Sequence, residues 1–94
     1  MDMNSNIRKK AYGIMKSIEA MNDNERSLRP SESFGHNYNN LRALCLKNNP
    51  ELEELLPPEV KLENYGDGYS HILTKHNFSE IHTFCSEIYQ LLEQ

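Results

Sequence analysis

The chain has 94 residues, of which 37% are hydrophobic and 26% charged, and its formal net charge is −4. This length predicts a single domain over residues 1–94 with one modest core, and the composition excludes an intrinsically disordered chain. The acidic balance argues against a general nucleic-acid binder, and the sequence has no apolar run long enough to span a membrane. The N-terminus has no signal-peptide pattern, so we expect a cytoplasmic protein that makes no membrane contact.

A first helix is predicted over residues 5–23, because apolar residues recur there at spacings of three and four. Gly13 lies inside this helix and costs up to about 1 kcal/mol relative to alanine. The glycine either permits a neighbouring helix to approach closely or has no role in packing. The apolar stripe consists of Ile7, Ala11, Ile14, Ile18 and Met21.

Basic residues are concentrated in this helix and in the polar linker, residues 25–31, that follows it. A solvated helix face is the favoured interpretation. The alternative is a weak nucleic-acid contact through a local basic patch, which the net charge disfavours. The residues of that patch would be Arg8, Lys9, Lys10, Lys16, Arg26 and Arg29.

A second helix is predicted over residues 32–48, because Ser31 or Ser33 can cap its start and an apolar stripe of helical period follows. The run over residues 34–40 is rich in amide and aromatic side chains. It is either a polar binding surface or, as we favour, the first turn of an amphipathic helix with its asparagines in water. The stripe consists of Phe34, Tyr38, Leu41, Leu44 and Cys45.

A short helix bounded by prolines is predicted over residues 50–56. Asn49 is a favourable N-cap and Pro50 fits the first helical position, whereas Pro57 and Pro58 cannot continue a helix. The leucines share one face and are expected in the core, where replacing either of the last two with alanine would cost about 2–4 kcal/mol. They are Leu52, Leu55 and Leu56, and the acidic residues expected in solvent are Glu51, Glu53 and Glu54.

Residues 59–73 are predicted to form a small β-hairpin, with a structured loop as the alternative. Val60 and Leu62 alternate with charged residues, as in a short strand, and two glycines then favour a turn. Tyrosines at a turn provide contact area at little entropic cost, so this turn is the predicted partner-binding site. The other interpretation is that both rings pack onto the helices and stiffen the loop. The predicted site residues are Tyr65, Asp67 and Tyr69.

The last helix is predicted over residues 76–93. Asn77 is its expected N-cap, and Glu80 three residues later completes a capping box. A continuous apolar stripe follows, which predicts that this helix packs in the core. The stripe consists of Phe78, Ile81, Phe84, Cys85, Ile88, Leu91 and Leu92.

Histidines and cysteines are the candidates for chemistry. His82 and Cys85 stand three residues apart on the last helix, and with His76 or His71 they could supply a metal site or a thiol enzyme. The sequence has no Cys-x-x-Cys or His-Glu-x-x-His motif, and both Cys45 and Cys85 lie in apolar stripes, which favours buried, reduced thiols. We therefore expect no cofactor, no metal and no catalytic residue.

Three segments carry a resemblance. They are Asn37-Tyr38-Asn39-x-Leu41-Arg42-x-Leu44, then Pro50-Glu51-Leu52 with Leu55-Leu56-Pro57-Pro58-Glu59-Val60, then Glu80-Ile81-x-Thr83-Phe84-Cys85-x-x-Ile88. Together they resemble small uncharacterised bacterial proteins of similar length. The resemblance carries no functional residues, and it implies a stand-alone bacterial protein or a fused accessory domain.

The chain is therefore predicted to be all-α or nearly so. We expect a three-helix antiparallel bundle with one short proline-bounded helix and a small β-hairpin. Small size, acidity and the lack of a catalytic motif favour a non-catalytic protein-interaction module over an enzyme. We expect an accessory or regulatory subunit of a bacterial system, such as stress response or phage defence, that binds a protein partner or forms a homo-oligomer.

Overall fold

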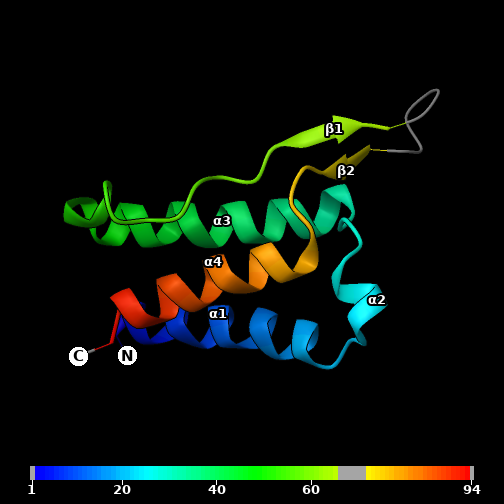
Figure 1. The fold of residues 1–94 in the computed structure, drawn as a ribbon. Coiled ribbons are helices and arrows are strands. Elements are labelled where there is room, and N and C mark those ends of the chain that lie inside the picture. The colour runs from blue at the N-terminus through cyan, green and yellow to red at the C-terminus, as the bar shows by residue number, and fades with distance from the viewer. Residues whose placement is uncertain (1, 66–71, 94) are drawn as a thin grey trace.

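The computed structural model describes residues 2–65 and 72–93. It is mostly helical with a small two-stranded antiparallel sheet, which confirms the predicted fold class at that level. Three long helices lie side by side, with the sheet at one end of them (Figure 1). In chain order the elements are α1 (Met3–Glu19), α2 (Asp23–Arg26), α3 (Glu32–Asn48), the 3₁₀ helix η1 (Pro50–Leu52), β1 (Leu62–Asn64), β2 (Ile72–Thr74) and α4 (Phe78–Leu91).

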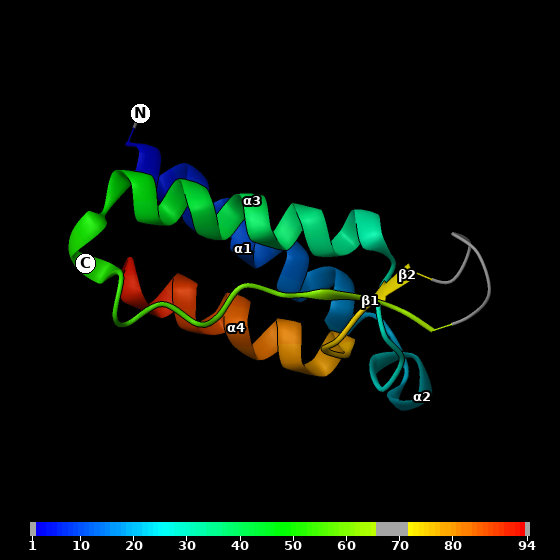
Figure 2. The ribbon, with the colours of Figure 1, turned by 90° about the horizontal axis from the view of Figure 1, so that it is seen from above.

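The three long helices differ in direction. α1 runs opposite to both α3 and α4, and these two run the same way (Figures 1 and 2). The chain after η1 makes this possible, because it returns along the helices to the end at which α4 begins. We call residues 53–61 the return segment. α3 and α4 are therefore parallel, whereas the sequence analysis expected an antiparallel bundle.

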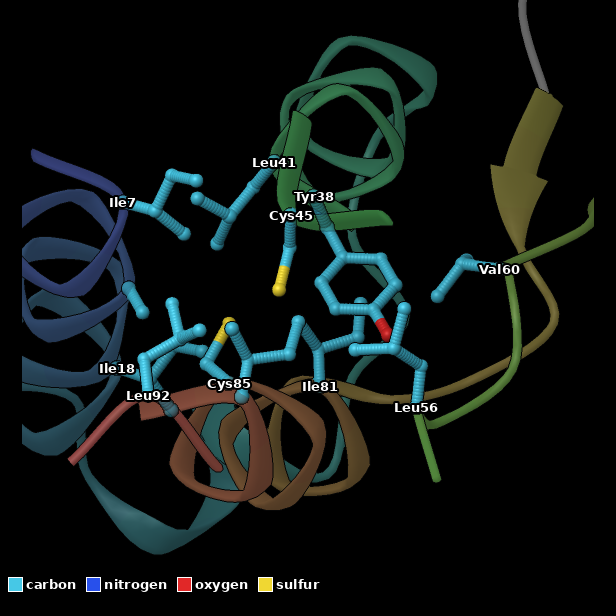
Figure 3. Packing of buried hydrophobic residues seen from close by; sticks show 12 residues of the cluster. Ile7, Ile18, Tyr38, Leu41, Cys45, Leu56, Val60, Ile81, Cys85 and Leu92 are labelled. Atoms are coloured by element: carbon cyan, nitrogen blue, oxygen red, sulfur yellow. The ribbon is translucent and has the colours of Figure 1, made fainter. Parts of the chain in front are cut away.

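The core lies between the three long helices, and the return segment covers one side of it (Figure 3). Each long helix contributes residues of its predicted stripe, and Leu56 and Val60 come from the return segment. Both cysteines are buried, as the sequence predicted. The fully buried apolar residues of the three long helices are Ile7, Ala11 and Ile18 from α1, Tyr38 and Cys45 from α3, and Ile81, Cys85 and Ile88 from α4.

Two predicted helix starts are confirmed. The Ser31 side chain accepts a hydrogen bond from the Phe34 amide (3.4 Å), and α3 has the predicted bounds. At α4 the Asn77 side chain accepts from the Glu80 amide (2.8 Å), and the Asn77 amide donates to the Glu80 carboxylate (3.0 Å). This reciprocal pair is the predicted capping box, which satisfies two amide groups that the helix itself cannot pair.

The predicted first helix ends too late. α1 stops at Glu19 rather than at residue 23, and a second capping box then starts α2. The Asn22 side chain accepts from the Glu25 amide (2.8 Å), and the Asn22 amide donates to the Glu25 carboxylate (2.9 Å). Asn22, which falls inside the predicted first helix, is therefore the start of a second helix, and part of the predicted linker is helical.

The predicted proline-bounded helix is wrong beyond its first residues, because η1 ends at Leu52. The Leu55 and Leu56 amides both donate to the Leu52 carbonyl (2.8 and 3.0 Å), which closes a turn. Pro57 disfavours helical backbone at the residue before it, so the turn does not continue. Leu56 is 9% exposed and belongs to the core, but Leu55 is 61% exposed, so its predicted burial is wrong.

Asn49 precedes η1, but its side chain makes no capping hydrogen bond there. The side chain is turned back to α3 and α1 instead. Its amide nitrogen donates to the Cys45 carbonyl (3.0 Å) and to the Asn4 side-chain oxygen (2.8 Å), and the Asn4 amide donates to the Asn49 side-chain oxygen (3.1 Å). Asn49 is 7% exposed, so these bonds satisfy a buried amide while they join the start of α1 to the end of α3.

Side chains of α3 hold the return segment in place. The Tyr38 hydroxyl donates to the Pro58 carbonyl (2.9 Å), and Arg42 Nε donates to the Pro57 carbonyl (2.6 Å). The Asn39 amide group pairs with both backbone groups of Val60, accepting from its N–H and donating to its C=O at 2.8 Å each. Val60 lies outside the two strands of the sheet, so no strand pairs with its backbone. The Asn39 side chain makes the hydrogen bonds that a neighbouring strand would otherwise make.

We expect Asn39→Ala to lower the free energy of unfolding by about 1–3 kcal/mol, because it leaves two partly buried backbone groups of Val60 without partners. The matched control is Asn40→Ala on the exposed face of the same helix, with an expected change within about 0.5 kcal/mol. Urea denaturation followed by circular dichroism measures both. Equal effects of the two substitutions would show that Asn39 does not secure the return segment.

The predicted hairpin over residues 59–73 forms, but its two strands are short and cover Leu62–Asn64 and Ile72–Thr74. Leu62 opposes Thr74 in the antiparallel register, and the Thr74 amide donates to the Pro30 carbonyl (3.0 Å). Gly35 of α3 lies against the same threonine, since a Cβ at this glycine would be 2.7 Å from Thr74 Cγ2. A two-stranded sheet is marginal alone, and here α3 and the chain before it support one of its strands.

Candidate functional site

A groove of about 540 Å³ is lined by residues of α1 and α3. This volume lies within the range of about 300–1,000 Å³ that is usual for small-molecule and anchor-residue sites. The groove lies beside the core rather than in it, and the lining is mainly apolar. The lining residues are Lys10, Gly13, Ile14 and Ser17 from α1 and Phe34, Asn37, Asn40, Leu41 and Leu44 from α3.

Gly13 contributes open space to this groove. A Cβ built at Gly13 has no heavy atom within 4 Å beyond the neighbouring residues and the helix's own backbone. The glycine therefore does not serve the close helix approach that the sequence analysis offered as one explanation. A methyl group at this position would therefore meet open space rather than a neighbouring side chain.

The groove has an apolar floor and a polar rim. Ile14, Phe34 and Leu44 are half-buried, so part of each side chain still faces outward. Lys10 and the amides of Asn37 and Asn40 are exposed, and Lys10 forms no ion pair with any residue in the described ranges. The lining residues carry amide, hydroxyl and ammonium groups, and none of them carries a carboxylate, imidazole or thiol.

The amide-rich run over residues 34–40 has two roles that the sequence could not separate. Asn39 is structural, because it pairs with the backbone of Val60. Asn37 and Asn40 line the groove instead, and both are exposed. The exposed positions of Asn37 and Asn40 agree with the favoured interpretation, an amphipathic helix with its asparagines in water, and a binding role for this run stays a prediction.

Tyr65 is the one predicted site residue that lies within the described ranges, since Asp67 and Tyr69 fall outside them. Its side chain is 41% exposed, and its hydroxyl donates to the Glu63 carboxylate (2.9 Å). The Arg29 guanidinium lies 4.9 Å from the centre of its ring. Tyr65 stays a candidate contact residue.

The residues of the metal or thiol alternative have separate surroundings. His82 Nε2 lies 2.8 Å from a Glu19 carboxylate oxygen, and the His76 ring packs edge-on against Phe84 with centres 5.1 Å apart. Cys85 is buried, and burial raises the pKa of its thiol to about 12, which disfavours the reactive thiolate. Across residues 2–65 and 72–93, no three His, Cys, Asp or Glu side chains come close enough to hold a metal ion.

The predicted basic residues do not form one continuous patch. Lys16 pairs with Glu19 (3.2 Å), Arg26 pairs with Asp23, and Arg29 covers Tyr65. Arg8 and Lys9 line a second cavity, on another side of α1, together with Ser5 and the aromatic rings of Tyr12 and Tyr89. We call these five residues the basic–aromatic face. No sequence pattern joins Tyr12 to Tyr89, because their positions are far apart in the chain.

Comparison with protein-family models, with curated proteins and with solved structures finds no match to this chain. Among the described residues, no helix combines the length and the apolar character that a membrane span requires. The resemblance to small bacterial proteins stays an expectation, and the argument for function depends on the geometry of the groove and of the basic–aromatic face.

Proposed function

We propose that the protein is a non-catalytic interaction module that binds an amphipathic helix of a partner protein in the groove between α1 and α3. The observation that carries this proposal is the apolar groove of about 540 Å³ that Gly13 leaves open. An amphipathic helix inserts apolar side chains at spacings of three, four and seven residues into such a groove. In the cell the module would act as an accessory or regulatory subunit.

The lining specifies the chemistry of the partner. Half-buried Ile14, Phe34 and Leu44 favour two or three large apolar anchors. Lys10 at the rim favours an acidic side chain beside those anchors, because its charge has no carboxylate partner among the described residues. The exposed amides of Asn37 and Asn40 add hydrogen bonds that fix the orientation of the bound helix.

The test fills the groove without harming the fold. Gly13→Leu places a large side chain in the empty space and also improves helix propensity, so the variant is expected to fold at least as well as the wild type. Ala43→Leu is the matched control, because it adds the same side chain to an exposed position of α3 that does not line the groove. A photoreactive residue at position 40 then captures proteins from the native lysate, and mass spectrometry identifies the cross-linked peptide.

The expected result is a cross-linked peptide with an amphipathic helical pattern and at least one acidic residue. Its yield is expected to fall by about tenfold or more with Gly13→Leu and to be retained with Ala43→Leu, since filling a central anchor pocket costs over about 1.4 kcal/mol. Light scattering of both variants detects a second copy of this chain as the occupant. Equal cross-linking by both variants would contradict the proposal.

A further inference from the structure

The basic–aromatic face is built from side chains of α1 and α4 that lie next to one another in a row. The Arg8 guanidinium lies 4.0 Å from the centre of the Tyr89 ring, and its Nε donates to the Tyr89 carbonyl (3.2 Å). The Tyr12 and Tyr89 rings lie 6.0 Å apart at an angle of 36°. Lys16 Nζ is 5.3 Å from the centre of the Tyr12 ring. Two adjacent tyrosine rings, one from α1 and one from α4, thus each have a cation of α1 within reach of the π-face.

This face surrounds a cavity of about 430 Å³ whose five lining residues include two cations and no carboxylate. Lys9 is exposed, and Tyr12 is 46% exposed. Neither Arg8 nor Lys9 forms an ion pair within residues 2–65 and 72–93. In a chain with net charge −4, two adjacent cations without carboxylate partners among the described residues lie next to an exposed ring, and this combination favours an anionic ligand with an aromatic part.

We propose that the basic–aromatic face binds one nucleotide unit, with the base stacked on Tyr12 and the phosphate held by Lys9 and Arg8. Every nucleobase has a π-face, so stacking on tyrosine tolerates any base, and cations beside the ring bind the phosphate. The Ser5 hydroxyl lies at the same cavity and adds a hydrogen-bonding group. Free nucleotides and residues of a single strand share this chemistry.

The size of the face limits the ligand. Lys16 at one end is paired with Glu19, whose carboxylate also contacts His82, so negative charge bounds the face there. An extended strand would need a longer basic track, which the acidic composition does not provide. One nucleotide unit is therefore the expected occupant. The groove proposed for a partner helix is lined by Lys10, Gly13 and Ser17 of α1, so the two sites share no residue.

The experiment measures binding of two probes, adenosine monophosphate and a short thymidine oligonucleotide, at low and at moderate salt. Tyr12→Ala and Lys9→Gln are each expected to weaken binding by about tenfold, because each removes one of the two contacts. Tyr12→Phe keeps the ring and is expected to retain binding within about twofold. Lys47→Gln is the charge control, since this exposed lysine near the end of α3 lines neither cavity. Thermal unfolding establishes that each variant is folded.

Two outcomes support the proposal and distinguish the sources of the ligand. Tighter binding of the oligonucleotide, with the expected loss in both face variants, assigns a single strand. Comparable binding of both probes, with the same losses, assigns a free nucleotide. The proposal is overturned if neither probe binds at low salt, or if Lys47→Gln weakens binding as much as Lys9→Gln while Tyr12→Ala has no effect. Neither result bears on cross-linking in the groove, so the two proposals fail separately.

Discussion

Leu56→Ala is expected to lower the free energy of unfolding by about 2–4 kcal/mol, whereas Leu55→Ala is expected to change it by less than about 0.5 kcal/mol. The two leucines are adjacent and chemically identical, so the comparison isolates burial. Leu56 is 9% exposed and packs in the core, whereas Leu55 is 61% exposed. The cavity left by the truncated side chain adds to the lost transfer free energy at Leu56 alone.

Urea denaturation of both variants under the same conditions measures this difference. The slope of the unfolding free energy against urea should stay unchanged, because neither substitution alters the surface that unfolding exposes by much. Equal and large losses at both positions would instead support the two-turn helix expected from the sequence, in which Leu52, Leu55 and Leu56 share one buried face. Equal and small losses would show that the return segment does not pack on the helices.

The helix predicted over residues 50–56 is wrong beyond Leu52 for a physical reason. The sequence rule assumes that leucines at helical spacing share a face, which holds while the backbone stays helical. After Leu52 the chain turns, and the backbone of the return segment is then paired by side chains of α3. Those contacts join residues 15–21 positions apart, and no local pattern reveals them. Tertiary hydrogen bonding decided the conformation here.

Helix starts could be predicted because the hydrogen bonds that cap them join residues close together in the chain. A capping box involves a residue and its neighbour three positions later, so Asn77 and Glu80 identify the start of α4 from the sequence alone. Asn22 and Glu25 have the same spacing and also form a capping box, although the predicted first helix runs past Asn22. Local chemistry therefore identifies the starts of α3 and α4, whereas the ends of α1 and of the short proline-bounded helix were predicted too late.

The candidate sites were less predictable, because each combines distant residues. The basic–aromatic face brings Arg8 and Tyr12 of α1 to Tyr89 of α4, and no sequence pattern joins residues of these two separate helices. The groove depends on Gly13, whose role differs from the helix contact that its sequence position suggested. A glycine in a helical pattern has the same local signature whether it faces a neighbour or an open groove.

Gly35 of α3 differs from Gly13 of α1, because it faces a packed neighbour. Gly35→Ala is therefore expected to lower the free energy of unfolding by about 1–3 kcal/mol. Its new Cβ would lie 2.7 Å from Thr74 Cγ2, and Thr74 is fully buried with its hydroxyl bonded to the His76 carbonyl. The threonine cannot turn away without losing that bond. Gly13→Ala is the control, because the same change in open space should stabilise α1 by up to about 1 kcal/mol.

A double variant tests the assigned cause. Thr74→Ser removes the Cγ2 methyl group that Gly35→Ala would contact, while it keeps the hydroxyl that donates to His76. Thr74→Ser alone should cost about 1 kcal/mol for the lost buried methyl group. Together the two changes move one methyl group across the contact, so the double variant should be more stable than Gly35→Ala, with a coupling energy of about 0.5–3 kcal/mol. Strictly additive losses would show that the glycine is required for its backbone and not for the close approach of α3 to β2.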